Sequence, residues 1–196
     1  MATILMAGSD GALKGRDSAR FETTLSAASV DMERFVGRSG VFVNSPTDTA
    51  EVMVAKVIKG ELYIGGRFDG VGGVAARNIA KWNGWRWLAV GQGIEGPVRD
   101  LIYAGGSLYA ASNVALNTGT SWRYTGYISK LVGSNWSVIG IFSDGLITSM
   151  VEFSSTLFVA GRFAQVTVPN GPSTSISYVA KYPLAGGAWV GAPSIG

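Results

Sequence analysis

The chain contains no cysteine and no histidine, and these two absences exclude whole classes of function. Without cysteine there are no disulfides and no thiolate zinc sites, and without histidine there are no imidazole metal ligands. Catalytic triads and dyads that depend on histidine are excluded for the same reason. We therefore expect a protein that is not an enzyme, with no catalytic residue, no cofactor and no metal site. Any metal would be held by oxygen ligands alone.

Long apolar runs are also missing, since no stretch approaches the ~18 apolar residues that a membrane-spanning helix needs. The first residues, MATILMAGSDGALKG, contain an apolar run without a positively charged region before it, unlike a secretory signal peptide. We expect no membrane partner and synthesis in the cytoplasm. The glycosylation sequon NWS at 135–137 would then stay unmodified.

Charge is sparse, with 16 basic against 13 acidic residues, a net charge of +3 and no long run of one sign. No basic stripe with interleaved aromatic residues is present, so we expect no specific nucleic-acid partner. Proline is scarce at 6 residues, whereas glycine is abundant at 28 and 47% of the chain is hydrophobic. This composition favours a folded protein with a real core and frequent turns.

One sequence repeat occurs three times along the chain. Its first half reads VIKGELYIGGRF at 57–68, YAGGSLYAASN at 103–113 and FSSTLFVAGRF at 153–163. Its second half reads NIAKWNGWRW at 78–87, YISKLVGSNW at 127–136 and YVAKYPLAGGAW at 178–189. Equivalent lysines and tryptophans recur at intervals of 49 to 53 residues. A period near 50 residues is typical of a propeller blade or a similar array unit.

Within each half, two β-type runs flank a short turn, at Lys59-Gly60 in the first half of the first copy and at Asn83-Gly84 in its second half. Asn-Gly favours a type I′ hairpin turn. Two hairpins per repeat predict a four-stranded sheet. We predict equivalent burial, as structural anchors between stacked sheets, for the recurrent large side chains. These anchors are Trp87, Trp136, Trp189, Leu62, Leu108 and Leu157.

The stretch LYIGGRF, followed by NIAKW, a further tryptophan and a Gly-rich linker, resembles the kelch-like repeats of the cell-polarity marker (Rax2-like) type. The resemblance covers residues 49–196. It implies an all-β, β-propeller-like array of four-stranded blades, as also found in phage virion proteins, with no shared catalytic residues. The second copy has Leu131 in place of Trp82, and the third has extra residues in its turn.

Residues 1–48 allow two interpretations. ERFVGRSGVFVNS at 33–45 can be aligned with AKWNGWRWLAVG at 80–91, which indicates a degenerate first blade. Apolar residues in 16–35 recur at helical spacing, which indicates a docking arm instead. Three blades do not close a ring, because propellers typically use four to eight. We favour an assembled state in which the open ends of the array are covered by copies of the chain or by other virion proteins.

GQGIEG at 91–96 matches the G-x-G-x-x-G of dinucleotide-binding loops, but a strand rather than a helix is predicted after it. We therefore interpret it as the linker between repeats. The acids Glu95, Asp144, Asp69, Asp100 and Glu152 are scattered, with no spacing that requires a catalytic pair.

Binding is the more credible task, because the loop between the two hairpins lengthens along the chain and such insertions commonly form interaction surfaces. The candidate contact residues for a ligand or partner are Trp85, Trp122, Arg123, Tyr124 and Tyr127. An alternative is that Trp122 only covers its own blade. We predict a non-enzymatic structural or adhesive virion protein, a capsid or tail component. The other hypothesis is a carbohydrate-binding, lectin-like module or a cytoplasmic propeller scaffold.

Overall fold

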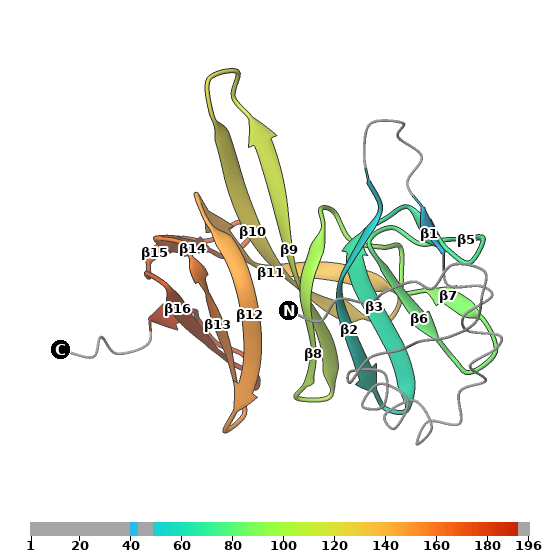
Figure 1. Cartoon of the computed structure of the whole chain (residues 1–196). Coiled ribbons are helices and arrows are strands. Elements are labelled where there is room, and N and C mark those ends of the chain that lie inside the picture. The colour runs from blue at the N-terminus through green and yellow to red at the C-terminus, as the bar shows by residue number, and fades with distance from the viewer. Residues whose placement is uncertain (1–39, 43–48, 192–196) are drawn as a thin grey trace, which may run out of the picture.

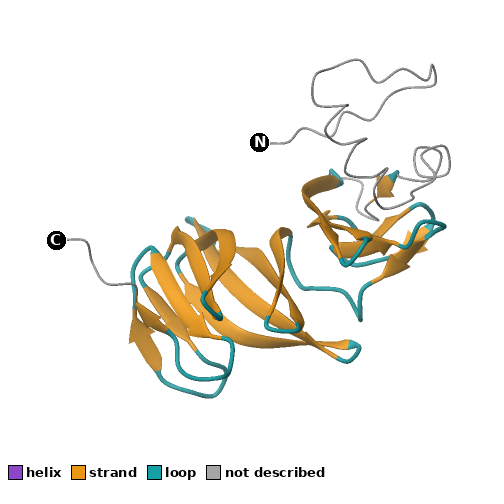
Figure 2. Ribbon diagram, turned by 90° about the horizontal axis from the view of Figure 1, so that it is seen from below, coloured by secondary structure: helices purple, strands orange, loops and turns teal. Residues whose placement is uncertain are grey.

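The computed structural model describes residues 40–42 and 49–191, in which every element is a β-strand or a loop (Figure 2). The strands form several antiparallel sheets, none of them closed. The predicted all-β class is therefore confirmed. Residues 1–39 and 43–48 lie outside the described residues, so the helical periodicity of 16–35 and most of the stretch assigned to a first blade or a docking arm lie outside them too.

Three four-stranded meanders correspond to the three repeats (Figure 1). The first sheet contains β2 (Glu51–Ile58), β3 (Glu61–Arg67), β6 (Ile79–Trp82) and β7 (Trp87–Ala89). The second sheet contains β8 (Val98–Ala104), β9 (Ser107–Asn117), β10 (Trp122–Val132) and β11 (Asn135–Ser143). The third sheet contains β12 (Leu146–Phe153), β13 (Thr156–Arg162), β16 (Val179–Pro183) and β17 (Val190–Gly191). In each sheet the spatial order of these strands is their order in the chain.

The first hairpin of each repeat turns through two residues with positive φ, as a type I′ turn requires. These pairs are Lys59-Gly60 at 53° and 79°, Gly105-Gly106 at 51° and 80°, and Ser154-Ser155 at 48° and 56°. The predicted turn at Lys59-Gly60 is therefore confirmed.

The predicted type I′ turn at Asn83-Gly84 is wrong. The φ angle is positive at Gly84 but not at Asn83, and the loop spans four residues, 83–86, between the paired Trp82 and Trp87. The side-chain oxygen of Asn83 accepts hydrogen bonds from the backbone N–H groups of Trp85 and Arg86, both at 3.0 Å. Asparagine can stabilise a turn through its side chain as well as through its own φ angle, and here the side chain prevails.

An insertion follows the second strand of every repeat. In the first repeat it is the short hairpin of β4 (Gly70–Val71) and β5 (Val74–Ala75), which pairs with β1 (Val41–Phe42). In the third repeat it is β14 (Gln165–Thr167) and β15 (Ser173–Ser175), which pairs with β11 of the preceding sheet. The second repeat instead lengthens β9 and β10 to 11 residues each. In Figure 1 these insertions lie on the side opposite the β2–β3, β8–β9 and β12–β13 turns.

The core consists of apolar layers on the faces of these sheets. Ile79 of the first sheet packs in one cluster with Val98 and Leu101 of the second, all three fully buried. A second layer joins the second and third sheets, and a third covers the other face of the first sheet. The repeated leucines Leu62, Leu108 and Leu157 are 3%, 5% and 0% exposed, and each full burial contributes about 1.5–3 kcal/mol.

Two of the repeated tryptophans connect neighbouring sheets. The Trp136 indole N–H donates to the Val90 carbonyl at 3.0 Å, and that of Trp189 donates to the Ile139 carbonyl at 2.8 Å. A glycine follows each acceptor and leaves room for the ring, since a Cβ at Gly140 would lie 2.9 Å from the indole of Trp189. Each tryptophan thus fastens its own sheet to the preceding one.

Burial of the three repeated tryptophans is not equivalent, contrary to the prediction. Trp87 and Trp189 are each 2% exposed, whereas Trp136 is only half-buried. The Trp189 ring packs edge-on against Phe142 and also contacts Tyr182, with centroid separations of 5.2 and 5.0 Å.

Candidate functional site

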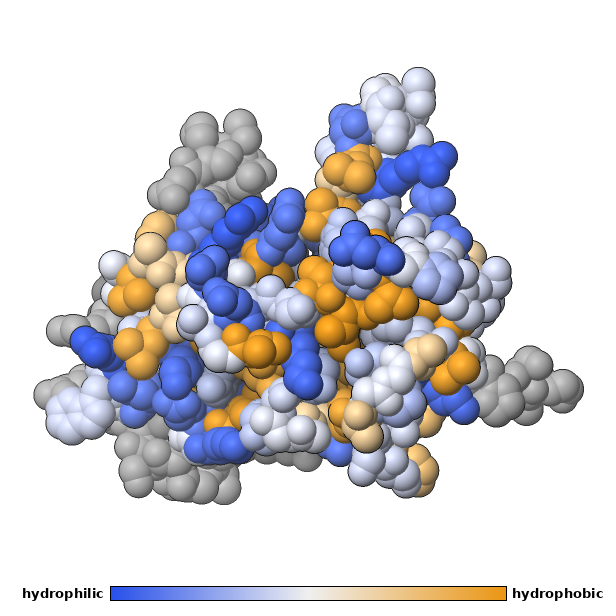
Figure 3. Space-filling view, turned by 180° about the vertical axis from the view of Figure 1, so that it is seen from behind, coloured by the Kyte–Doolittle hydropathy of each residue, from blue (hydrophilic) through white to orange (hydrophobic). Residues whose placement is uncertain are grey.

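A long hairpin at the ends of β9 and β10 stands clear of the rest of the protein, as Figures 1 and 3 show. Nine consecutive residues, 115–123, are exposed, and we call this segment with its paired neighbours, residues 114–125, the projecting hairpin. Its surface carries hydrophilic and hydrophobic residues side by side (Figure 3). A paired, exposed element of this kind offers backbone rigidity and accessible side chains together.

The tip of the projecting hairpin is held by local hydrogen bonds. The backbone N–H of Thr118 donates to the Ser121 carbonyl at 3.0 Å, and the Thr118 hydroxyl donates to the same carbonyl at 2.9 Å. The N–H of Gly119 donates to the Asn117 side chain at 2.8 Å, and its φ of +86° suits glycine. These hydrogen bonds restrain the backbone of the tip, and such restraint lowers the entropy cost of binding a partner.

Strand register sorts the hairpin side chains onto two faces. Trp122 pairs with Asn117 and Tyr124 with Ala115, so these four residues share one face. Arg123 pairs with Leu116 and therefore lies on the other face. Trp122 is 62% exposed and Leu116 is 53% exposed, so each face has a large apolar group in solvent.

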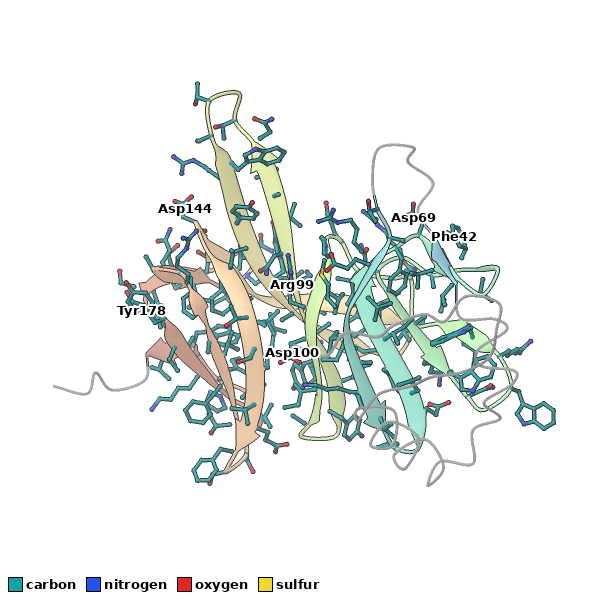
Figure 4. All side chains as sticks on the ribbon, viewed as in Figure 1. Phe42, Asp69, Arg99, Asp100, Asp144 and Tyr178 are labelled. Carbon is teal, nitrogen blue, oxygen red and sulfur yellow. The ribbon has the colours of Figure 1, made fainter. Side chains whose placement is uncertain are left out.

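The base of the projecting hairpin is fixed to the linker before β12. Arg123 forms an ion pair with Asp144, with one guanidinium nitrogen 2.9 and 3.2 Å from the two carboxylate oxygens. The N–H of Gly145 donates to the Tyr124 carbonyl at 2.9 Å. Figure 4 shows Asp144 at this junction. Both side chains of the ion pair are more than 60% exposed, so it orients Arg123 and contributes about 0–1 kcal/mol to stability.

The structure brings together three of the five predicted contact residues. Trp122, Arg123 and Tyr124 all lie on the projecting hairpin, where most of the Trp122 side chain is exposed to solvent. Tyr127 lies farther along β10 and is half-buried. Trp85 is 68% exposed but belongs to the β6–β7 loop of the first sheet.

The linker motif GQGIEG and the candidate acidic residues can be placed in the fold. GQGIEG connects β7 to β8, and its three glycines have φ angles of 62°, 81° and 75°. The Ile94 carbonyl within it accepts a hydrogen bond from the side chain of the buried Asn78, which fixes the linker against the first sheet. In the described part of the chain, no group of three or more acidic side chains could hold a metal ion.

Asp100 is an acidic residue whose structural role was not predicted from the sequence. Its Oδ1 atom lies 2.6 Å from the Lys56 ammonium of the first sheet, and its Oδ2 atom accepts from the Met150 N–H of the third sheet at 2.6 Å. Oδ1 also accepts from the N–H of Leu101 at 2.9 Å. Figure 4 shows Asp100 between β8 and β12. The Asp100 carboxylate of the second sheet thus links all three sheets. The sequence did contain one signal of this role, because Asp100 is an acidic residue on a strand and the equivalent residues of the other two repeats are uncharged.

Burial and ion pairing shift the pKa values of three groups. The hydrogen bond from Lys81 to Glu61, at 2.9 Å, raises the pKa of Lys81. Burial raises the pKa of Tyr63 and that of Tyr109, and the negative charge of Glu152 adds to the effect at Tyr109. These groups lie on the stacking faces of the sheets and not on the projecting hairpin.

Comparison of the chain with protein-family models, with curated proteins and with solved structures gave no significant match. The resemblance to kelch-like repeats therefore stays a prediction that depends on the motifs alone. Within the described residues, no helix is long and apolar enough to cross a membrane.

Proposed function

We propose that this chain is a non-enzymatic structural or adhesive protein of a virion, a capsid or tail component built from β-propeller blades. In this proposal the three sheets are consecutive blades, and the projecting hairpin is the surface that contacts other virion proteins. The virion assignment derives from the motif resemblance, and the mode of action derives from the geometry of the hairpin.

Three features support the propeller interpretation. Each repeat is a four-stranded meander, consecutive sheets pack face to face, and one tryptophan hydrogen bond recurs between the first and second sheets and between the second and third. Four-stranded blades that repeat around an axis are the definition of a propeller. Asp100 lies where the innermost strands β2, β8 and β12 converge, as expected near such an axis.

The observation that carries the binding function is the exposure of residues 115–123 with Trp122 on an ordered tip. Tryptophan and arginine are the residues most enriched at the energetic centres of protein interfaces. Trp122 and Arg123 are neighbours here, and Asp144 orients the arginine. A partner that buries the Trp122 ring gains apolar contact without ordering a flexible loop first.

The experiment is incorporation of the tagged full chain into particles purified from producing cells. We expect the unmodified chain in the particles, and we expect Trp122→Ala to reduce its incorporation at least about tenfold, because loss of a central tryptophan costs about 2 kcal/mol or more. Val132→Ala, which removes an exposed apolar side chain from the β10–β11 turn outside the projecting hairpin, is the control and should leave incorporation unchanged. A chain that is monomeric and absent from every purified particle would refute the proposal.

A carbohydrate ligand is the second candidate, because Asn117 pairs with Trp122 across the two strands, and Thr118 and Ser121 add further polar groups at the same tip. An aromatic face flanked by polar groups suits a sugar ring. A glycan array probed with the full chain and with Trp122→Ala separates the two candidates. Glycan binding that disappears in the variant favours the lectin-like function, and an array without signal favours a protein partner.

A further inference from the structure

The outer face of the third sheet is exposed and apolar, and we call it the open face. Residues of β12, β13 and β16 line a shallow depression on it: Ser149, Val151, Phe153, Phe158, Ala160 and Val179. Val151 is 58% exposed and Phe153 is 70% exposed. The third sheet lies at one end of the row of three sheets (Figure 1). A contiguous apolar surface of this kind is typical of an interaction site.

The same positions are covered in the other two sheets. The residue equivalent to Phe153 is Ile58 in the first sheet and Ala104 in the second, and these are 9% and 1% exposed. Ile58 packs in one cluster with apolar residues of β8 and β9, and Ala104 packs in one cluster with apolar residues of β12 and β13. The open face therefore continues a stacking interface that the chain uses twice, and its position in the repeat fits it to pack against another sheet.

Side-chain size changes along the open face in a way that makes the face complementary to itself. Three cross-strand pairs of β12 and β13 follow one another on it: Ser149 with Ala160, Val151 with Phe158, and Phe153 with Thr156. The pair at one end consists of two small residues, whereas the exposed Phe153 ring lies at the other end. Two such faces with their strands in opposite directions bring each Phe153 over the small Ser149–Ala160 pair of the other face.

We propose that the open face binds the same face of a second copy of this chain, about a two-fold axis that runs across the strands. The interface is isologous, so the Phe153 ring of each copy packs against Ser149 and Ala160 of the other. This inference goes beyond the proposed function, because it concerns a different surface from the projecting hairpin and does not depend on the virion assignment.

A head-to-tail arrangement of copies is the competing geometry, and burial argues against it. A copy that continued the array would place the outer face of its first sheet on the open face. That face of the first sheet is already buried, with Leu62, Ile64 and Trp82 at 3%, 5% and 0% exposure. The pairing of two open faces uses only surfaces that are exposed in the single chain.

Lys181 is a charged residue on the open face, and its position is compatible with stacking. It pairs with Phe158 across the strands and is half-buried. The equivalent Lys81 and Lys130 lie on faces that the next sheet covers, with ammonium groups 6.0 and 5.8 Å from tyrosine ring centroids. Lysine can pack its aliphatic stem on apolar surface and keep its charge in water. The proposed axis places the two Lys181 residues opposite each other, so their charges weaken the association.

The size of the open face predicts a reversible dimer. β13 has seven residues and β16 has five. A four-stranded face of this length, with strands about 4.8 Å apart and about 3.4 Å per residue, covers at most about 450 Å² per copy. Standard interfaces bury about 800 Å² per partner, and smaller ones are commonly weak. We therefore expect the two copies to separate on dilution.

Sedimentation equilibrium of the full chain from about 1 μM to about 1 mM tests the proposal. We expect a monomer–dimer equilibrium that Val151→Asp weakens at least about tenfold, because its carboxylate would face the apolar surface of the other copy. Val132→Asp is the matched control, since Val132 is also 58% exposed but lies at the β10–β11 turn. Lys181→Met should strengthen the dimer. Trp122→Ala should leave it unchanged, which separates this test from that of the proposed function.

Photo-cross-linking then tests the arrangement of the two faces. A benzophenone amino acid replaces Phe153, light and ¹⁵N-labelled chains are mixed, and adducts are identified by mass spectrometry. We expect adducts between light and heavy chains, within residues 146–162 of β12 and β13.

Three results would overturn the proposal. The first is a chain that stays monomeric up to about 1 mM. The second is a dimer that Val151→Asp weakens no more than Val132→Asp does. The third is a set of Phe153 adducts confined to a single chain, which would show that another part of the same chain covers the open face.

Discussion

Replacing Asp100 with alanine tests whether one carboxylate holds the three sheets in their arrangement. The substitution removes the acceptor for the backbone N–H groups of Leu101 and Met150, which are residues of the buried core. A buried donor left without a partner costs about 1–3 kcal/mol, so two of them amount to about 2–6 kcal/mol. A domain is usually stable by only about 5–15 kcal/mol, so the effect should be large.

The ion pair with Lys56 contributes much less to this figure. The Lys56 side chain is 38% exposed and regains solvent when its partner is removed, so its share is about 0–1 kcal/mol. Lys56→Met is therefore the matched control, since it breaks the ion pair and keeps both backbone hydrogen bonds. The stability of Asp100→Asn should lie between the stabilities of Lys56→Met and Asp100→Ala. The NH₂ group of asparagine would face a hydrogen-bond donor whichever of the two carboxylate oxygens it replaces, so one hydrogen-bonding position is lost.

Urea unfolding followed by tryptophan fluorescence measures these differences, with the denaturant dependence compared between variants. We expect the free energy of unfolding to decrease in the order Lys56→Met, Asp100→Asn, Asp100→Ala. The reasoning is refuted if Asp100→Ala loses no more stability than Lys56→Met, because the backbone hydrogen bonds would then contribute nothing.

Three further predictions concern the stacked faces. Trp189→Ala should cost about 3–5 kcal/mol, and Trp136→Ala should cost less because that ring is only half-buried; chemical denaturation of both variants checks the order. Gly140→Ala should cost about 1–3 kcal/mol, because the added methyl meets the Trp189 ring at 2.9 Å. Tyr109 has a buried hydroxyl with no hydrogen-bond partner in the described structure, so Tyr109→Phe should stabilise by about 1 kcal/mol. Burial raises the pKa of this phenol, so stability should be unaffected below about pH 10 and fall above it, and Tyr109→Phe should reduce that alkaline loss in thermal melts.

The repeat pattern was sufficient to predict the all-β class and four strands in each repeat, because these depend on local signals. Leucines and tryptophans recur at one interval, and turn residues separate short β-type runs. The loop at 83–86 was mispredicted because Asn83 acts through its side chain, which the dipeptide rule does not consider. Exposure was also hard to predict, since Trp136 and Trp189 occupy equivalent positions but differ in burial.

Strand pairing between different repeats could not be predicted from local sequence signals. Nothing in residues 165–175 indicates that β14 pairs with β11 of the preceding repeat, because that choice depends on which strand edge the folded array leaves available. The role of Asp100 was missed for a related reason. Two of its three partners, Lys56 and Met150, come from the first and third sheets, so they become neighbours of Asp100 only after the sheets stack. Of the predicted contact residues, only the three that are adjacent in sequence lie on the projecting hairpin.

The three insertions give a further argument that the projecting hairpin has a task. In the first and third repeats the insertion pairs with another strand, β1 or β11, and its residues Val71 and Val166 are buried. In the second repeat the insertion extends into solvent, although ordering its backbone costs about 1–2 kcal/mol per residue and the exposed residues bury little apolar surface in return. The strand pairing and the hydrogen bonds of the tip offset part of that cost. The stability of the array does not require an exposed hairpin with Trp122 near its end, and this arrangement is the one expected if the hairpin contacts a partner as proposed.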